Sequence, residues 1–257
     1  MRQGVVSMIV SSKAPPRISF GERKIKVSVV VPTYEERDNV KLLIERIART
    51  LDGRDYEIVV VDDNSPDGTA EAAASLSQEY PIEVIQRDGK LGLASAISDG
   101  FGHSSGDIVG VIDADLQHPP ELIRDLVSAI EQRYDIALGS RLVDDGAMEN
   151  WTLWRKTVSR GATLLARPLT EVKDPLSGYF FMRRAVIDGG KFKPIGYKLL
   201  LEVLVKGNYK QVKEVPYIFG TREKGKSKLG LDEYIKYLKL LCHLYLYKAK
   251  ERLKSAK

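Results

Sequence analysis

Three short clusters of acidic and aromatic residues carry the strongest signs of chemistry in this sequence. The sharpest is Asp113-Ala114-Asp115, which directly follows a short apolar run; an Asp62-Asp63 pair and the segment 32–36 (PTYEE) also end apolar runs. Mg²⁺ takes oxygen ligands, typically one or two carboxylates completed by phosphate oxygens and water. The Asp-x-Asp pair therefore predicts metal-dependent chemistry on a phosphorylated substrate. The alternative is an ordinary solvated turn, in which Asp is common.

No glycine-rich phosphate loop follows the first apolar run, where Pro32 stands instead. Both the G-x-G-x-x-G motif and the P-loop lysine motif are missing from this turn, which argues against a dinucleotide dehydrogenase or a P-loop kinase. Without a glycine cradle, a diphosphate must be neutralised by a metal ion and by Lys or Arg side chains. The candidates are Lys90, Arg141, Arg222 and Lys228.

Alternating strands and helices are expected to position these clusters. Apolar runs predict strands at 25–33, 56–61, 82–86, 107–112 and 135–139. Asp38 is expected to cap a first helix, and apolar spacing predicts further helices at 69–80, 93–103 and 119–134. This alternation is typical of an α/β fold with a mostly parallel central sheet flanked by helices. Ligands of such sheets bind beyond the carboxyl ends of the strands, where the three clusters would meet.

The second half of the chain is less regular. Helices are expected at 151–166, 197–206 and 231–253, and strands at 178–182 and 211–219. Because no repeat or linker divides the chain, we expect one continuous domain at 25–230. A flexible arm at 1–24 would precede it, and a basic amphipathic helix at 231–257 would follow it.

Composition excludes several classes of protein. Of the 257 residues, 43% are apolar and 29% charged, unlike disordered, collagen-like or disulfide-rich chains. The single cysteine, Cys242, can form no internal bridge and supports no structural zinc cluster, and its apolar helix predicts a place in the core. No run approaches the roughly 20 apolar residues that span a bilayer.

The positive charge is concentrated at the end of the chain. Residues 221–257 carry a net charge of +7 against +5 for the whole chain, so residues 1–220 carry −2. A basic tail can meet nucleic acid, anionic lipid head groups or a phosphorylated substrate. The acidic balance of residues 1–220 and the acidic clusters at the expected ligand edge argue against nucleic acid.

Eight separate motifs, in order along the chain, resemble those of one family. The first four resemble family 2 glycosyltransferases of the GT-A fold: 27–36 (VSVVVPTYEE), 59–69 (VVVDDNSPDGT), 90–94 (KLGLA) and 113–118 (DADLQH). The others narrow the resemblance to the dolichol-phosphate mannose synthase branch: 139–141 (GSR), 155–161 (RKTVSRG), 174–180 (DPLSGYF) and 227–229 (SKL). The resemblance covers roughly residues 25–244.

The resemblance implies an inverting transfer of mannose from GDP-mannose to dolichyl or polyprenyl phosphate, giving dolichyl phosphate mannose and GDP. It implies Mg²⁺ or Mn²⁺ held by Asp115 and Gln117, and catalytic roles for Asp113, Asp115 and Arg141. The implied donor site comprises Pro32, Tyr34, Glu36, Val61, Asp63, Lys90, Asp113, Ala114, Asp115, Arg222 and Lys228. The implied acceptor phosphate site comprises Arg141, Arg155, Ser159, Asp174 and Ser177.

A phosphate acceptor suits this residue set because it needs no general base. Its second pKa lies near 6, so it is largely a dianion at neutral pH and needs positioning rather than deprotonation. The alternatives are that Arg155 lies on a solvated helix face and that the basic loop 222–228 is flexible and binds nothing. The Gln-x-x-Arg-Trp motif of processive relatives is missing, because residues 199–202 read LLLE, so repeated chain elongation is not expected.

The expected terminal helix indicates whether the protein lies at a membrane. Its apolar, aromatic residues are expected either to rest in a membrane interface or to pack on the domain. The lipid acceptor implies peripheral association with a membrane surface, on the cytoplasmic face, without a membrane-spanning segment. Two other functions stay open: the same transfer from UDP-glucose or another nucleotide sugar, and a noncatalytic module that binds nucleotide or lipid and regulates a partner.

Overall fold

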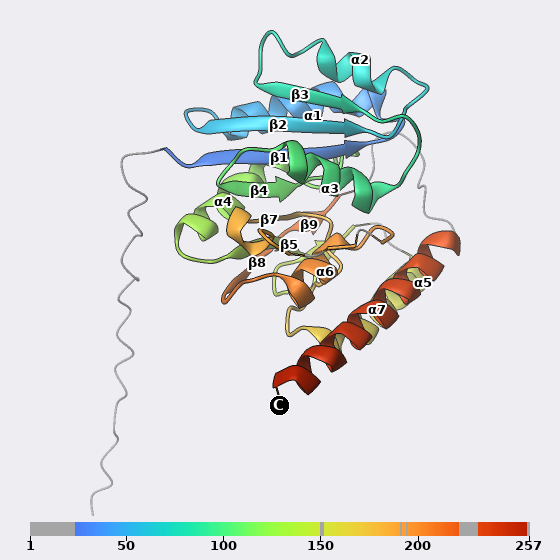
Figure 1. Ribbon diagram of the computed structural model, residues 1–257. Coiled ribbons are helices and arrows are strands. Elements are labelled where there is room, and N and C mark those ends of the chain that lie inside the picture. The colour runs from blue at the N-terminus through green and yellow to red at the C-terminus, as the bar shows by residue number, and fades with distance from the viewer. Residues whose placement is uncertain (1–23, 150–151, 191, 194, 221–230, 256–257) are drawn as a thin grey trace, which may run out of the picture.

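A seven-stranded sheet with helices on both faces forms the centre of the molecule (Figure 1). The computed structural model describes residues 24–149, 152–190, 192–193, 195–220 and 231–255. The strands of the sheet are β1 (Lys26–Thr33), β2 (Asp55–Asp62), β3 (Ile82–Gln86), β4 (Ile108–Val111), β5 (Ile136–Ser140), β7 (Phe180–Arg183) and β8 (Val212–Pro216). A second, two-stranded sheet pairs β6 (Ala147–Met148) with β9 (Ile218–Phe219).

Seven α-helices and three short 3₁₀ turns are present in the described part of the chain. The helices are α1 (Arg37–Thr50), α2 (Thr69–Ala74), α3 (Leu93–His103), α4 (Ile123–Glu131), α5 (Leu153–Ala166), α6 (Leu199–Lys206) and α7 (Leu231–Ser255). The 3₁₀ turns are η1 (Pro120–Leu122), η2 (Arg167–Leu169) and η3 (Arg184–Val186).

The strand order of the large sheet is β3-β2-β1-β4-β7-β5-β8. All neighbours run parallel except β7, which is antiparallel to both β4 and β5. The expected α/β fold with a mostly parallel sheet is confirmed. Because Thr33 of β1 pairs with Asp62 of β2, these two strands end at the same level, and the turns that follow them share one edge of the sheet.

Burial on both faces explains the apolar strand sequences. Successive side chains of a strand point to opposite faces. Val29 and Val31 of β1 pack in one core cluster with α1, α2 and α4, whereas Val30 packs in a second cluster with α3 and α6. The run of apolar residues in β1 is therefore needed to fill two cores at once.

The structure corrects several expected boundaries. Helix α2 ends at Ala74 rather than at residue 80, and the Ser75 hydroxyl donates to the Ala72 carbonyl (2.8 Å), which competes with the helical ladder. Glu36, not Asp38, stands at the N-cap of α1, and Asp38 lies in the first turn. The strand expected at 211–219 divides into β8 and β9, and the helix expected at 119–134 begins as η1 before α4.

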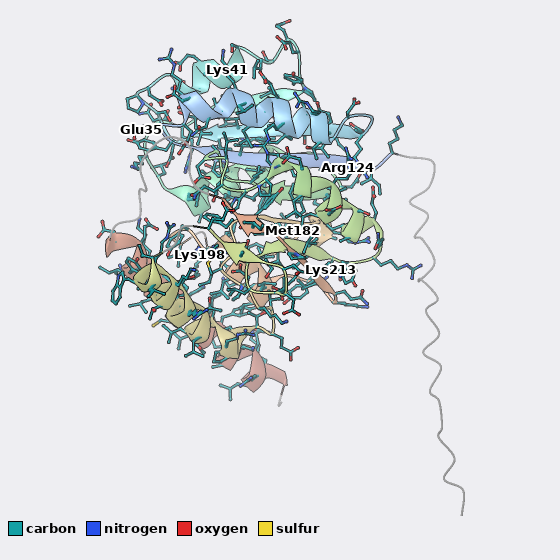
Figure 2. All side chains as sticks on the ribbon, turned by 180° about the vertical axis from the view of Figure 1, so that it is seen from behind. Glu35, Lys41, Arg124, Met182, Lys198 and Lys213 are labelled. Carbon is teal, nitrogen blue, oxygen red and sulfur yellow. The ribbon has the colours of Figure 1, made fainter. Side chains whose placement is uncertain are left out.

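Helix α7 lies alongside α5 below the sheet (Figure 1). Four of its residues (Tyr237, Leu240, Leu241 and Leu244) are buried against the end of α5, Leu176 and Leu201 of α6. The Tyr237 hydroxyl donates to the Ala162 carbonyl (2.6 Å). Figure 2 shows the pair from behind, with Lys198 between it and the sheet. Cys242 is exposed, which corrects its expected place in the core.

None of the described helices combines the length and the apolar character that crossing a membrane requires. The basic terminal helix expected from the sequence is present as α7.

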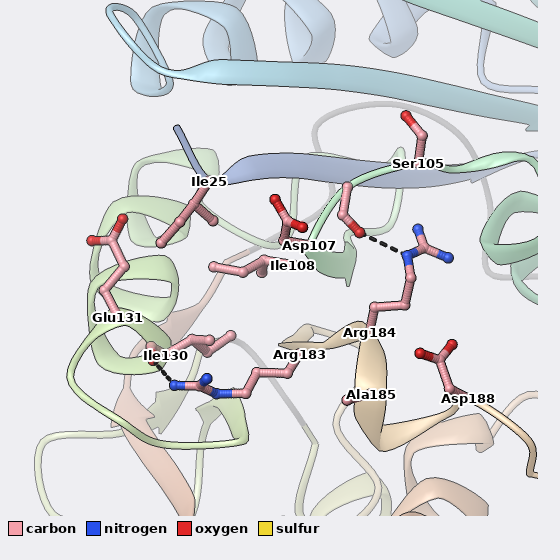
Figure 3. Close-up of a pocket in the computed structure, with 11 residues that line it drawn as sticks. Ile25, Ser105, Asp107, Ile108, Ile130, Glu131, Arg183, Arg184, Ala185 and Asp188 are labelled. Atoms are coloured by element: carbon pink, nitrogen blue, oxygen red, sulfur yellow. Dashed lines mark hydrogen bonds between the residues drawn. The ribbon is translucent and has the colours of Figure 1, made fainter. Parts of the chain in front are cut away.

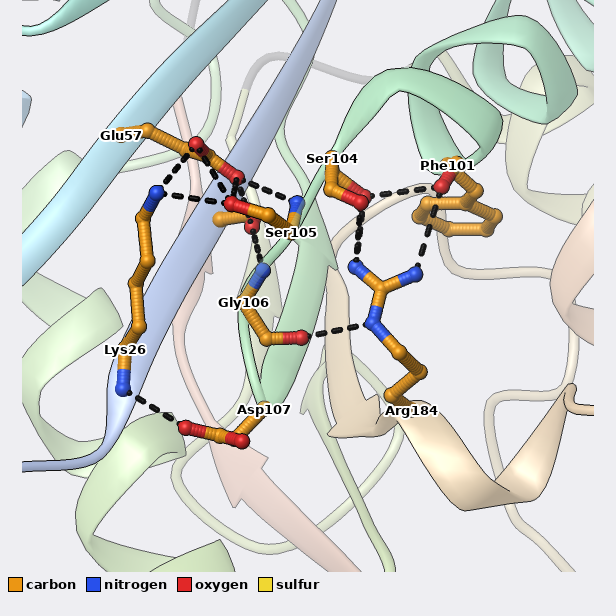
Figure 4. Close-up of polar contacts among 9 residues, drawn as sticks. Lys26, Glu57, Phe101, Ser104, Ser105, Gly106, Asp107 and Arg184 are labelled. Atoms are coloured by element: carbon orange, nitrogen blue, oxygen red, sulfur yellow. Dashed lines mark hydrogen bonds and ion pairs between the residues drawn. The ribbon is translucent and has the colours of Figure 1, made fainter. Parts of the chain in front are cut away.

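The opposite edge of the sheet, where β1 and β2 begin, is held by a polar network around Glu57 (Figure 4). This carboxylate accepts hydrogen bonds from the Lys26 ammonium, the Ser28 hydroxyl and the Ser105 amide, each 2.6 Å long. Nearby, the Arg184 guanidinium donates to the Gly106 carbonyl (2.7 Å) and to the Ser104 carbonyl (2.9 Å). The network ties the start of the sheet to the turn before β4.

A pocket of about 290 Å³ lies at this same edge (Figure 3). Its two arginines are engaged with the backbone: Arg183 donates to the Ile130 carbonyl (2.9 Å), and Arg184 to that of Gly106. Because these cations are already used to hold the fold, the pocket offers little to an anionic ligand. The candidate functional site lies at the other edge.

Replacing Glu57 with Gln tests the network. Partial burial alone raises the pKa of Glu57, but the hydrogen bonds from Lys26, Ser105 and Ser28 outweigh it and lower the pKa from 4.5 to about 2. A lowered folded pKa means that the stabilisation is present above about pH 4.5 and is lost as the pH falls toward about 2. We expect Glu57→Gln to cost about 1–3 kcal/mol of unfolding free energy at pH 7.

The measurement is urea unfolding at a series of pH values. The variant should show a flatter dependence than the wild type between pH 4.5 and 2. Glu83→Gln is the control, because the Glu83–His103 pair is about half exposed on both sides. Equal slopes for wild type and Glu57→Gln would contradict this account.

Candidate functional site

Three turns that follow β1, β2 and β4 form the candidate site. Each contains a non-glycine residue with a left-handed backbone: Glu35 (φ 53°), Asn64 (φ 60°) and Leu116 (φ 60°). Such residues cost free energy and cluster at functional sites, where the surrounding structure holds them in place. Leu116 is the least usual of the three, because Leu lacks the short polar side chain that makes Asn tolerant of this conformation. Because β1 lies between β2 and β4 and runs parallel to both, the three predicted clusters meet at one edge of the sheet.

The turn after β2 is organised by two aspartates with different partners. Asp62 is fully buried and accepts hydrogen bonds from the Thr33 hydroxyl (2.8 Å) and the Ser65 hydroxyl (2.6 Å), so it joins the ends of β1 and β2. Asp63 forms an ion pair with Arg87 (2.7 Å) and accepts from the Gly92 amide (2.8 Å). The family resemblance implies a place for Asp63 in the donor site, and in the structure its carboxylate holds the loop that carries Lys90.

The β1 and β2 ends bring together most of the residues expected around a nucleotide. The Lys90 ammonium lies 3.7 Å from the centre of the Tyr34 ring, a cation–π contact across the edge of the site. Glu36 is buried and accepts from the Asn39 side-chain amide (2.8 Å). Pro32 and Val61 pair across β1 and β2 just before the turns.

The turn after β4 carries the acidic pair. Asp115 is 7% exposed and accepts from the Gln117 backbone amide (3.1 Å), and Ala114 between the two aspartates is buried. The Asp113 side chain is 33% exposed. Glycine at 178 permits a close approach, since a Cβ there would lie 3.2 Å from Asp113 Oδ2. The chain entering β7 therefore packs directly against the acidic turn.

The donor atoms at this turn fit a hard divalent cation that is only partly enclosed by protein. The described residues contain no group of three or more His, Cys, Asp or Glu side chains that could surround a metal ion. The Gln117 amide nitrogen donates to the Gly220 carbonyl (2.9 Å), so the amide oxygen is the atom that would serve as a ligand. One carboxylate and one amide oxygen suit Mg²⁺ or Mn²⁺, which complete their shells with phosphate oxygens and water.

His118 lies beneath this turn in a group of aromatic rings. It stacks on Tyr179 at 5.0 Å and is edge-on to Tyr217 and Phe219. Burial, assisted by the charge of Arg141, lowers the pKa of His118 to about 4, although Asp115 opposes the shift. The imidazole is therefore neutral at physiological pH and contributes packing to the acidic turn.

A buried ion pair forms the other side of the site. The Arg141 guanidinium donates two hydrogen bonds to Asp174, each 2.8 Å long, and the Arg141 amide donates a third (3.0 Å). Asp174 is fully buried. Burial alone raises its pKa, but the hydrogen bonds and charge of Arg141 outweigh burial and lower it. Asp174 thus fixes the position of Arg141, and Ser177 fixes the same loop by donating to the Gly139 carbonyl (2.8 Å).

Lys198 belongs to this group, and sequence reasoning missed it. Its ammonium donates to the Leu176 carbonyl (2.8 Å). Burial and the charge of Arg141 lower the pKa of Lys198 to about 8, while Asp174 and Asp113 act in the opposite direction. The only signal in the sequence is a lone charge immediately before an apolar helix, which is also what a solvated helix end looks like.

Not all of the predicted site residues can be placed. The charge of Arg155, from the first turn of α5, reaches Lys198 and lowers its pKa, so the structure brings Arg155 near the Arg141 group. Ser159 follows one turn later on α5 and is partly buried. Arg222 and Lys228 lie outside the described residues.

Comparisons with known proteins identify the family of the chain. The family model described as "Glycosyl transferase family 2" matches residues 28–190. The chain is 49% identical over 225 residues to the dolichol-phosphate mannosyltransferase of Pyrococcus furiosus, covering 86% of this chain and 63% of that protein. It is 35% identical over 237 residues to the protein of that name from Saccharomyces cerevisiae, covering 87% of this chain and 88% of the relative. The chain thus spans less than two thirds of the Pyrococcus relative.

Solved structures show the same fold. Glucosyl-3-phosphoglycerate synthase from Mycobacterium tuberculosis, crystallised with Mn²⁺, UDP and glucosyl-3-phosphoglycerate, superposes with a TM-score of 0.63 at 23% identity. The likeness covers 87% of this chain and 79% of that one. The same enzyme with Mg²⁺ and UDP gives a TM-score of 0.63 at 22% identity. The expected GT-A fold is confirmed.

Replacing Asp174 with Asn tests the buried ion pair. We expect a loss of about 3–5 kcal/mol in unfolding free energy, because the variant leaves the Arg141 charge buried without its counter-charge. Guanidinium unfolding measures the loss. Glu121→Gln is the matched control: Arg46 also grips Glu121 with two hydrogen bonds, but this carboxylate is 60% exposed, so about 0–1 kcal/mol is expected. Similar losses in both variants would refute the special role of the buried pair.

Proposed function

This chain belongs to glycosyl transferase family 2, and we propose that it transfers mannose from GDP-mannose to dolichyl phosphate or a related polyprenyl phosphate. The products would be dolichyl phosphate mannose and GDP. Relatives named dolichol-phosphate mannosyltransferase in an archaeon and in fungi support this choice of substrates. The observation that carries the proposal is the contact between the acidic turn after β4 and the loop fixed by the Arg141–Asp174 pair. A diphosphate site and a phosphate site would then adjoin.

The reaction requires charge to be placed rather than a proton to be removed. An oxygen of the acceptor phosphate attacks the anomeric carbon, and the bond from that carbon to the diphosphate breaks with inversion. A divalent cation held by Asp115 and Gln117 would stabilise the negative charge that develops on the leaving diphosphate. Asp113, at the same turn, would face the donor sugar.

The acceptor phosphate would be bound by Arg141, Arg155 and Ser159. Asp174 and Ser177 would not contact the phosphate. They would instead hold Arg141 and its loop in the orientation that binds the phosphate. Arginine suits this task because its planar guanidinium can donate two parallel hydrogen bonds to a phosphate. A phosphate dianion needs no base, so the neutral His118 has no proton to accept in this reaction.

The donor nucleotide would lie over the ends of β1 and β2, in contact with Pro32, Tyr34, Glu36 and Val61. Lys90, which lies beside Tyr34, would neutralise the diphosphate. Asp63 would act by anchoring the loop that carries Lys90. Arg222 and Lys228 complete the proposed donor site.

Peripheral attachment to a membrane, at its cytoplasmic face, is part of the proposal. Helix α5 presents Leu153, Trp154 and Leu164, which are 84%, 76% and 70% exposed. Helix α7 presents a stripe that contains Leu238 and Leu246, which are 53% and 63% exposed. Exposed apolar surface beside basic residues is typical of helices that rest in a membrane interface.

The first test is transfer of labelled sugar to short-chain dolichyl phosphate. We expect label from GDP-mannose, but not from UDP-glucose, to enter the lipid phase in the presence of Mn²⁺, and EDTA to abolish it. Asp115→Asn should lower the rate about 100-fold or more, because it weakens the site that neutralises the leaving group. Asp125→Asn, at an exposed position of α4, is the control.

Two other results of this transfer assay would change the proposal. Transfer of label from UDP-glucose instead would overturn the choice of GDP-mannose as donor, but it would still support glycosyl transfer as the type of reaction. No transfer from any nucleotide sugar would favour a noncatalytic module that binds nucleotide or lipid.

Vesicle flotation tests the membrane surface. The double variant Leu164→Ser, Leu246→Ser removes one exposed apolar residue from each helix. We expect about 30-fold weaker partition into anionic vesicles, since two leucines that each contribute a transfer free energy of about 1 kcal/mol together contribute about 2 kcal/mol. Leu42→Ser is the control, because Leu42 is 44% exposed on α1 in the other half of the molecule. Equal flotation of all three proteins would remove these helices from the membrane contact.

A further inference from the structure

One cation at the candidate site has no role in the reaction described above. We propose that Lys198 is a third cationic ligand of the acceptor phosphate, beside Arg141 and Arg155. This inference rests on the proposed function and adds to it a residue outside the motifs that resemble the family.

The fold holds the ammonium against the loop that shapes the site. Lys198 Nζ donates to the Leu176 carbonyl (2.8 Å), and Leu176 lies between Asp174, the partner of Arg141, and Gly178, which touches Asp113. The first turn of α6 is itself fixed, because Leu199 and Leu201 are buried in two different core clusters. The backbone that carries Lys198 is therefore fixed by packing, and its ammonium is held in place, unlike that of a mobile surface lysine.

The ammonium forms no ion pair with a described carboxylate, and its nearest aromatic contact is the Tyr197 ring, 4.4 Å from Nζ to the ring centre. Its one hydrogen-bond partner among the described residues is the Leu176 carbonyl. An ammonium has three donors, so two remain for a ligand. Asp174 does not pair with the ammonium, since its carboxylate is gripped on both oxygens by Arg141.

The surrounding charges identify the kind of ligand. Burial and the charges of Arg141 and Arg155 act unfavourably on the Lys198 ammonium, whereas Asp174 and Asp113 act favourably. Three cations gathered at a low-dielectric site repel one another and lose hydration, which costs free energy unless an anion joins them. A phosphate dianion between them would offset that cost. A lysine needed only to anchor the Leu176 carbonyl could be replaced by a neutral donor without this penalty.

The proposed transfer requires no proton from Lys198. One phosphate oxygen forms a bond to the anomeric carbon, and the electron pair of the breaking bond leaves with the diphosphate. No proton moves in this step, so Lys198 stays protonated and its function is to bind and orient the acceptor. Its contribution should therefore be visible in acceptor binding even when no donor is present.

The test measures binding of citronellyl phosphate, a short-chain polyprenyl phosphate, by calorimetry without nucleotide sugar. Lys198→Met keeps the length of the side chain and removes its charge, and we expect about 10- to 100-fold weaker binding, as for loss of a hydrogen bond to a charged group. Lys198→Arg should retain more affinity than Lys198→Met. Lys213→Met, an exposed lysine on β8, is the matched control. Thermal unfolding of each variant verifies that it is folded.

Citronellol, which lacks the phosphate, separates charge from packing. Its binding should be the same in the wild type and in Lys198→Met. Equal citronellyl phosphate affinity in these two proteins, or an equal loss for phosphate and alcohol, would overturn the proposal. If Lys198→Met fails to fold, Lys198→Gln takes its place with the same expected loss. A wild type that binds citronellyl phosphate but transfers no mannose would refute the proposed function, while the lysine variants would still test this inference.

Discussion

The buried ion pair between Arg141 and Asp174 is the interaction on which the proposed acceptor side of the site depends. Arg141 follows β5, and Asp174 precedes β7, so the pair joins two segments that are 33 positions apart in sequence. Both charges are removed from water, and three hydrogen bonds between the two residues offset that loss. The pair fixes the course of the chain from Asp174 to Gly178, which in turn touches the acidic turn after β4 and the Lys198 ammonium.

The proposed donor side is built differently. There, short-range contacts within and between neighbouring turns hold the shape: Asp62 joins the ends of β1 and β2, and Asp63 anchors the loop that carries Lys90. Adjacent parallel strands end at the same level, so the turns meet without a long connection. One edge of the sheet therefore combines a locally determined half with a half that needs contacts distant in sequence.

This difference explains what could be predicted from the sequence. The strands β1 and β2, helix α3 and the acidic cluster were accessible because their patterns are local: β-branched runs, helical spacing and carboxylates after a strand. The antiparallel direction of β7 was not accessible, because its apolar run 180–182 (FFM) reads the same whichever way the strand runs. Lys198 was missed for the same reason: its significance comes from Arg141 and Asp174, which are brought near it only by the fold. Cys242 was misplaced because the packed stripe of α7 passes through Leu241 and Leu244 instead.

The insertion of β7 has a consequence for how the chain folds as it is made. The four strands β1 to β4 come from the first 111 residues, whereas the partner that covers the free side of β4 ends at Arg183. During synthesis, β4 is an open edge strand until some 70 further residues have emerged. Pairing across such a sequence distance is slow, because the connecting loop must be closed before the contact is gained. We therefore expect the half that would bind the nucleotide to assemble first, and the half that would receive the lipid to be completed last.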